Sequence, residues 1–278
     1  MKCMSRFRCL MHSLWLPAAE RWVKRMRVYT CRNEWEDMMT CIYEAWSSKL
    51  GHQNIRLEIE PIGQYSLFDE YVHVDCDSVK AQKVMDAVCR KISPYFYSKL
   101  AFVSGAYEED RLDTIFKVMI LGFAKGESAL EMVCYREVMR FNDISKRFGG
   151  EIHKFREFLR FHQVNEVLYV AHIEPKSKVL LGLADSFSDR MPSEYWMIVD
   201  DVHSEVLVHP KDEDCYIQRL TKEELERLIL TEKANDSYTD LWQVFFDSIA
   251  IKERENARCQ TNLFPKWVRK HAVEFMKN

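Results

Sequence analysis

The sequence has few glycines and prolines and no long apolar run. Eight glycines and seven prolines are spread along 278 residues, and no stretch is rich enough in Pro, Gly or Ser to form a flexible linker. No run approaches the roughly 20 apolar residues that a membrane-spanning helix requires. Because 47% of the residues are hydrophobic, the chain can bury one large core or two modest ones. We expect a folded cytoplasmic protein.

The common signatures of enzymes and metal centres are also missing. The sequence contains no Gly-rich phosphate loop, no G-x-S-x-G elbow, no H-E-x-x-H pair and no dinucleotide-binding fingerprint. Its nine cysteines are scattered, and no two have the C-x-x-C spacing of a zinc ribbon or a radical SAM cluster. We therefore expect reduced thiols, no cofactor and no metal site. Whether the protein is an enzyme stays open.

Residues 1–25 differ from the rest of the chain in charge. They include six Lys or Arg and one acid, so that this +5 segment leaves −8 of the total net charge of −3 on the remaining residues. An acidic body does not by itself indicate a nucleic-acid binder. We interpret 1–25 as a basic extension, either disordered or not translated, because Met26 directly precedes a strand-like run.

The pattern of apolar residues changes at the glycine pair Gly149–Gly150. Before it, residues 26–150 form a βα-rich and helical region, with strands expected at 27–31, 55–59 and 71–74, and helices from 33, from 77 or 78, and across 95–148. We expect the last of these helices to end at the glycine pair. Residues 151–278 then form an antiparallel sheet with C-terminal helices, packed as one unit with the preceding region.

The second half has the two-residue period of strands. FREFLRF at 155–161 and VLYVAHIEP at 167–175 predict an antiparallel hairpin. The remaining expected elements are a helix at 178–189, strands at 195–199, 205–208 and 215–218, and helices at 222–230, from 239 or 240 to 251, and from Pro265 onward. The fold class is therefore α+β, helix-rich, with a mainly antiparallel sheet as a β-β-α-β-β layer in the second half.

Charge is shared unevenly within this second half. Residues 182–241 carry fifteen acids against six Lys or Arg, whereas 136–162 carry seven basic residues against four acids, and 252–271 carry six against two. On a strand, Arg156 and Arg160 would share one face beside His153, where guanidinium groups can bind phosphates in pairs. A solvated face paired with acids is the alternative. The sequence does not show whether the two basic segments meet.

Two further polar groups are candidates for chemistry. Asp200, Asp201 and His203 lie in the turn after the apolar run WMIV, and with His172 in the neighbouring hairpin they form a possible acid–base or metal constellation. Ordinary turn chemistry of aspartate is the alternative. A second polar group near the C-terminus consists of Arg254, Asn256 and Gln260. These side chains could contact a base edge or a phosphate. Alternatively, they could fix the junction to the last helix.

Four strings in a fixed order resemble a known family: TCIYEAW, YREVMRFNDISKRFGGEIHKFREFLRF, VAHIEP through DSFSDRM to WMIVDD, and IAIKERENARCQTNLFPKWVRK. Together they resemble an uncharacterised bacterial family of DNA metabolism proteins, from about Met26 to the C-terminus. The resemblance implies a gene neighbour encoding a DNA repair radical SAM protein and, in some relatives, fusion to a uracil-DNA glycosylase domain. It brings no established activity. Ser186 and Val199 replace histidines of many relatives, so no role is expected to depend on those imidazoles.

The leading hypothesis is an accessory protein of DNA metabolism or repair that binds nucleic acid and presents it to a radical SAM partner. The candidate nucleic-acid-binding residues are His153, Arg156, Arg160, Arg190, Arg254, Asn256, Gln260 and Lys266. The acidic stretch 182–241 would face away from DNA and dock the partner. One alternative is a hydrolase, either a nuclease or a base-processing enzyme, that uses Asp200 and His203. A second alternative is a scaffold that binds only protein, and the oligomeric state is open.

Overall fold

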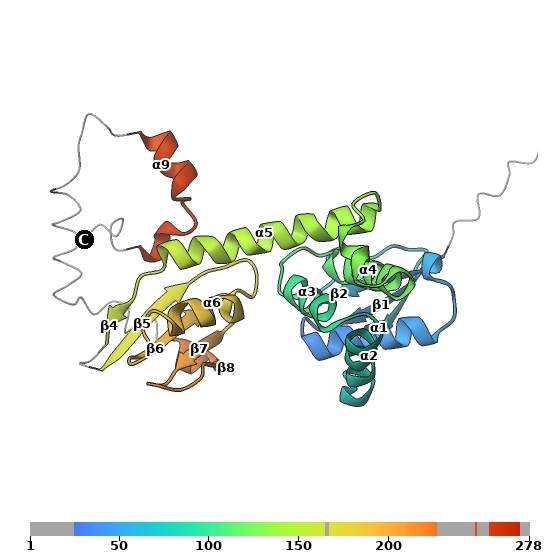
Figure 1. Cartoon of the computed structure of the whole chain (residues 1–278), viewed down its shortest axis with the longest axis horizontal. Helices are drawn as coiled ribbons and strands as arrows, with labels where there is room; N and C mark the ends of the chain where they lie inside the picture. The colour runs from blue at the N-terminus through green and yellow to red at the C-terminus, as the bar shows by residue number, and fades with distance from the viewer. Residues whose placement is uncertain (1–24, 165–166, 227–247, 249–255, 273–278) are drawn as a thin grey trace, which may run out of the picture. The chain divides into compact units, whose positions relative to one another are not determined.

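A computed structural model describes residues 25–164, 167–226, 248 and 256–272 (Figure 1). The chain divides into two compact units, residues 1–87 and 88–278. Apart from Arg25, the basic extension lies outside the described residues. Within these residues every cysteine is a free thiol, and no helix is long and apolar enough to cross a membrane.

The first unit contains a small parallel sheet. Its elements are β1 (Arg27–Cys31), α1 (Trp35–Ser47), η1 (His52–Asn54), β2 (Ile55–Ile59), β3 (Glu70–His73) and the start of α2 (Ser78–Lys91). The strand order is β2-β1-β3, and β1 is parallel to both neighbours. The helix α1 buries Met38, Met39 and Ile42, so its apolar stripe supplies the core beside the sheet. The predicted strands and helices of this unit are confirmed.

The second unit begins with packed helices. These are α3 (Pro94–Ser104), α4 (Arg111–Lys125), the 3₁₀ segment η2 (Glu127–Glu131) and α5 (Arg136–Phe158). Ser93 caps α3, because its hydroxyl accepts a hydrogen bond from the Phe96 N–H, and Pro94 occupies the first turn. The neighbouring α4 buries Leu112, Ile115 and Phe116. This confirms the helical character predicted for 95–148.

The helix α5 does not end at the glycine pair, so that prediction is wrong. It continues through Gly149 and Gly150 to Phe158, and the boundary expected at residue 150 falls inside it. Its buried residues keep the spacing of a helix across the glycines: Val138, Phe141, Ile144, Phe148, Ile152 and Phe155. Each glycine costs a helix about 1 kcal/mol relative to alanine, whereas burying a side chain such as Ile152 or Phe155 contributes about 1.5–3 kcal/mol. Packing beyond the glycines therefore outweighs their low helix propensity.

A five-stranded sheet follows α5. Its elements are β4 (His162–Gln163), β5 (Leu168–Ile173), α6 (Leu180–Ser188), β6 (Tyr195–Asp200), β7 (Glu205–His209) and β8 (Tyr216–Arg219), in the strand order β4-β5-β6-β7-β8. The strands β5 and β6 are parallel and are joined through α6, whereas the other pairs are antiparallel. The α+β class and the mainly antiparallel sheet are confirmed. The strand predicted at 155–161 is wrong, because only His162 and Gln163 pair with β5.

The two faces of this sheet pack against different partners. On one face Trp196 contacts Phe187 of α6 and Phe161, which precedes β4. On the other face Val170, Val199 and Val206 form a buried cluster, against which Leu168, Met197, Val208, Leu220 and Leu225 also pack. Alternation along the strands thus assigns successive residues to two separate environments.

The described C-terminal segment is short and only partly helical. Residues 222–226 are helical as expected, and Thr221 and Glu224 form the capping box. The segment 256–272 contains α9 (Ala257–Leu263) and the 3₁₀ turn η4 (Arg269–His271). The helix expected from Pro265 is wrong, because the backbone closes i to i+3 turns there, including Val268 N–H to Pro265 C=O at 3.1 Å. The helix expected from 239 or 240 to 251 falls outside the described residues, except for Ser248.

Candidate functional site

Titratable side chains gather where β5 and β6 end. Because these strands are parallel, their carboxyl ends meet at the same edge of the sheet, with Ile173 beside Asp200. The backbone pairing continues one step further, because the Asp201 N–H donates to the Ile173 carbonyl at 3.1 Å. In sheets with parallel strands, ligands commonly bind at the carboxyl ends of the strands. The carboxyl ends of β5 and β6 are therefore a candidate binding site.

Asp200 and His203, the predicted catalytic candidates, lie together in a closed turn. Asp200 is fully buried, and its Oδ1 accepts hydrogen bonds from the N–H groups of Val202 and His203 at 3.0 Å each. Its Oδ2 lies 2.7 Å from Nδ1 of His203, and this carboxylate raises the pKa of His203 above its usual value. Both carboxylate oxygens therefore have partners within the turn itself, as in the turn-chemistry alternative.

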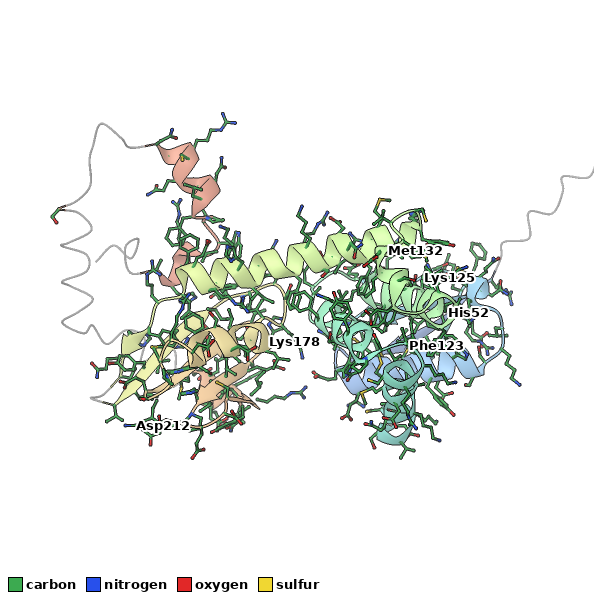
Figure 2. The ribbon with its side chains drawn as sticks, viewed as in Figure 1. His52, Phe123, Lys125, Met132, Lys178 and Asp212 are labelled. Atoms are coloured by element: carbon green, nitrogen blue, oxygen red, sulfur yellow. The ribbon has the colours of Figure 1, made fainter. Side chains whose placement is uncertain are left out.

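Close to this turn, a lysine and a glutamate form an ion pair. Nζ of Lys178, which is labelled in Figure 2, lies 3.2 Å from Oε1 of Glu205 at the start of β7. These groups act on His203 in opposite directions: Glu205 adds to the rise in its pKa, whereas Lys178 and burial oppose it. The charges around Asp200 and His203 are thus largely balanced by neighbouring side chains.

A second constellation lies on the other face of the sheet edge. Nδ1 of His172, whose side chain is fully buried, lies 3.1 Å from Oδ1 of Asp201. The His172 ring stacks with the rings of both His162 and His271, at centroid distances of 6.1 and 6.2 Å. Nε2 of His271 lies 3.8 Å from Oε1 of Glu174, the residue that follows β5. Three imidazoles and two carboxylates are therefore grouped here.

Three of these residues could hold an ion together. One ligand atom each from Glu174, Asp201 and His271 lie within 4.8 Å of one another. The sequence expectation named Asp200, Asp201, His203 and His172 but missed Glu174 and His271. The signal for Glu174 was its position directly after an apolar strand that ends beside β6, whereas nothing in the local sequence indicates His271.

The predicted nucleic-acid-binding residues of the arm lie on a helix and the loop after it. His153 is exposed on α5 and lies 3.1 Å from Glu157. Arg156 donates to the Gly182 carbonyl through its guanidinium, and Arg190 donates to the Arg156 carbonyl at 3.3 Å. Arg160 follows the end of α5 and donates to the carbonyls of Glu157 and Leu159 at 3.4 and 3.3 Å. Because 155–158 is helical, the shared strand face expected for Arg156 and Arg160 is wrong.

The C-terminal candidates have different surroundings. Asn256 caps α9, since its side-chain oxygen accepts from the Cys259 N–H at 2.9 Å. Gln260 and Lys266 have exposed side chains. Arg254 falls outside the described residues. Asn256 therefore has a structural role in addition to any role in binding.

The two basic segments meet in space. The segment with α9 lies beside the C-terminal end of α5 (Figure 1). Nζ of Lys154 on α5 lies 3.5 Å from the Leu263 carbonyl, and the rings of Phe158 and Phe264 stack at 4.1 Å. The Lys154 ammonium lies over the Phe158 ring at 5.4 Å, and the Arg269 guanidinium lies over the Phe264 ring at 5.6 Å. We call the surface formed by the last two turns of α5 and residues 256–271 the basic ridge. Between 256 and 272 the chain contains four Lys or Arg and no acid.

A protein-family model matches more than half of the chain. The family model described as a domain of unknown function, DUF4130, matches residues 109–274. The matched residues include α5, the five-stranded sheet and the described C-terminal segment, and therefore both the basic ridge and the group around His172. No curated protein matches the chain.

Proposed function

The chain belongs to the DUF4130 family of unknown function, and from this premise we propose that it binds nucleic acid along the basic ridge as an accessory protein of DNA metabolism. The observation that carries the proposal is the contact between Lys154 and Leu263. It joins two basic segments that are about a hundred residues apart in the sequence. Basic side chains brought together on one surface can bind successive phosphates of a strand.

The ridge has exposed groups suited to a nucleic-acid strand. Arg258, Lys266 and Lys270 have exposed side chains, and no acid interrupts this segment. Trp267 is 42% exposed and packs edge-on against Phe155 of α5, so part of its ring faces solvent. Cations beside a partly exposed aromatic ring are typical of surfaces where bases stack and phosphates are neutralised.

Arg156 and Arg160 are less suited to phosphate contacts than the sequence suggested. Their guanidinium groups donate to backbone carbonyls at the end of α5 and at α6. In this arrangement they hold the end of α5 and the following loop, and the phosphate contacts fall to the exposed cations of the C-terminal segment. His153 and Arg190 remain accessible beside them.

The proposed partner is a DNA repair radical SAM protein, and the proposed compartment is the cytoplasm. The resemblance to DNA metabolism proteins supports a cytoplasmic protein that works beside a DNA repair radical SAM protein. The loop between β7 and β8 supplies an acidic surface for docking such a partner. Asp212, labelled in Figure 2, Glu213 and Asp214 are all exposed in this loop. Binding of DNA and binding of the partner would then use different surfaces.

The test is fluorescence anisotropy of the full chain with single- and double-stranded DNA across a salt series. The variant Arg258→Gln/Lys266→Gln removes two charges from the ridge. Its matched control, Lys211→Gln/Lys222→Gln, removes two exposed charges elsewhere. If each ridge contact contributes roughly 0.7 kcal/mol, the ridge variant binds about tenfold more weakly at low salt.

The salt dependence gives a second readout. Loss of two phosphate contacts lowers the slope of log affinity against log salt by roughly 1.4 for single strands and 1.8 for duplex DNA. The control variant should keep the wild-type affinity and slope. Absence of salt-sensitive binding in the wild type, or equal losses in both variants, would contradict the proposal. Retained binding to a radical SAM protein without DNA binding would indicate a protein scaffold instead.

A further inference from the structure

The group around His172 has the donor atoms of a metal site. Glu174 follows β5, Asp201 follows β6 and His271 belongs to η4, so three separate elements each supply one ligand. The ligand atoms lie within 4.8 Å of one another, and the Glu174–His271 pair is already at 3.8 Å. Ligands that are each about 2.1 Å from one ion lie roughly 3–4 Å apart. Small side-chain rotations would therefore bring all three onto a single ion.

The buried side chain of His172 lies against this group and, among the described residues, has one nitrogen without a partner. Its side chain is fully buried, and Nε2 has no hydrogen-bond partner in the part of the chain that the structure describes. A buried polar atom left without a partner costs about 1–3 kcal/mol, and such atoms in native proteins call for an explanation. Nδ1 faces Asp201, and an imidazole that bonds a ligating carboxylate is a common support around metal sites. The residue thus fits a role in orienting Asp201.

Lys270 pairs with one of the two carboxylates, that of Glu174. Its ammonium contacts Oε1 of Glu174, and 61% of its side chain is exposed. Neighbouring carboxylates repel each other unless a cation lies beside them. Because Lys270 is long and mostly exposed, it can move into solvent when another cation takes its place. Lysine and metal ion would therefore compete for Glu174.

We propose that Glu174, Asp201 and His271 bind a divalent first-row transition-metal ion such as Mn²⁺ or Zn²⁺. The imidazole ligand selects for this class, because Mg²⁺ and Ca²⁺ prefer sites made of oxygen atoms alone. His172 positions Asp201, and Lys270 occupies the vicinity of Glu174 when no ion is bound. This inference does not depend on the proposed nucleic-acid binding, because it concerns the affinity for the metal alone.

The test is isothermal titration calorimetry of the chelator-treated full chain with Mn²⁺, Zn²⁺ and Mg²⁺ in separate titrations. We expect one transition-metal ion per chain, with Mg²⁺ at least tenfold weaker. The variants Glu174→Gln and Asp201→Asn should each weaken binding by about tenfold or more, because each replaces an anionic ligand by a neutral amide. The matched control Glu194→Gln changes an exposed glutamate before β6 and should bind as the wild type does.

A variant that strengthens binding separates this site from general charge effects. Lys270→Gln removes the ammonium that competes for Glu174, so this variant should bind the ion several-fold more tightly. Any lysine-to-glutamine variant has the same change in net charge. Lys211→Gln is the control for that change. Circular dichroism checks that each variant is folded. No stoichiometric binding by the wild type, or equal affinities of the Glu174→Gln and Glu194→Gln proteins, would overturn the proposal, and Mg²⁺ binding as tight as Mn²⁺ would overturn the choice of ion.

Discussion

Replacing Gly150 by alanine tests the most consequential difference between sequence and structure. Gly150 lies inside α5, and a Cβ atom built there has nothing within 4 Å. Alanine is favoured over glycine in a helix interior by about 0.5–1 kcal/mol. The Gly150→Ala protein should therefore be more stable by about that amount. In a unit of this size, 1 kcal/mol corresponds to about 2–4 °C in the unfolding midpoint.

The same substitution at other glycines supplies controls of opposite sign. At Gly182 in α6 an added Cβ would lie 2.6 Å from Cδ1 of Ile152, so Gly182→Ala should cost about 1–3 kcal/mol. At Gly126 the backbone has a φ of +74°, which L residues rarely adopt, so Gly126→Ala should also be destabilising. Urea unfolding followed by circular dichroism measures all three against the wild type.

The sign of the stability change in Gly150→Ala distinguishes a continuous α5 from a helix that ends at the glycine pair. If the helix ended at the glycine pair with a left-handed backbone, alanine would be strained and the protein would lose roughly 1 kcal/mol. A destabilised Gly150→Ala protein would thus refute a continuous α5. It would also remove the basis of the basic ridge, because α5 carries Lys154 and Phe158 to the C-terminal segment.

Three further predictions concern the turn and the ridge. Asp200→Asn removes the charge from a buried three-bond acceptor and should lower the free energy of unfolding by about 1–2 kcal/mol in urea titrations. Because the folded-state pKa of His203 is raised, its contribution to stability is complete below about pH 6.5 and is lost as pH rises through the higher folded value. The stability difference between wild type and His203→Gln should therefore shrink in alkaline buffer, and a constant difference would contradict this. Phe264→Ala removes the stack on Phe158, so it should expose the C-terminal segment to limited proteolysis and weaken DNA binding at low salt, whereas unchanged cleavage would argue against the stack.

Local patterns in the sequence predicted most of the regular elements. The strands from Tyr195 and Glu205 and the helix α6 were expected within one or two residues, because their apolar periods and turns are short-range signals. The helix end predicted at Gly149–Gly150 was wrong because glycine is a local stop signal, whereas the apolar residues after the pair continue the buried face of α5. In FREFLRF, Phe155, Phe158 and Leu159 have helical spacing, and Phe155 is buried on the same face of α5 as Ile152. The local sequence is compatible with both a strand and a helix, and tertiary packing favours the helix.

The candidate site was less predictable because long-range pairing forms it. A hairpin was expected before β5, but the parallel alignment of β5 with β6 through α6 is what brings Glu174 beside Asp201. His271 joins them from almost a hundred residues later. Periodicity and turn residues report on neighbours in sequence, and therefore carry no information about such contacts.

Strand alternation explains why two adjacent aspartates have such different surroundings. Asp200 points toward the α6 face, where the turn to β7 satisfies both of its oxygens, so its loss acts mainly on stability. Asp201 points to the opposite face, where the buried imidazole of His172 meets it and Glu174 and His271 are close. The carboxylate of Asp200 is bound within its own turn, whereas that of Asp201 faces side chains from β5, from Glu174 just after it, and from η4. A sequence motif of two aspartates and a histidine therefore divides into a structural half and a half that is suited to binding.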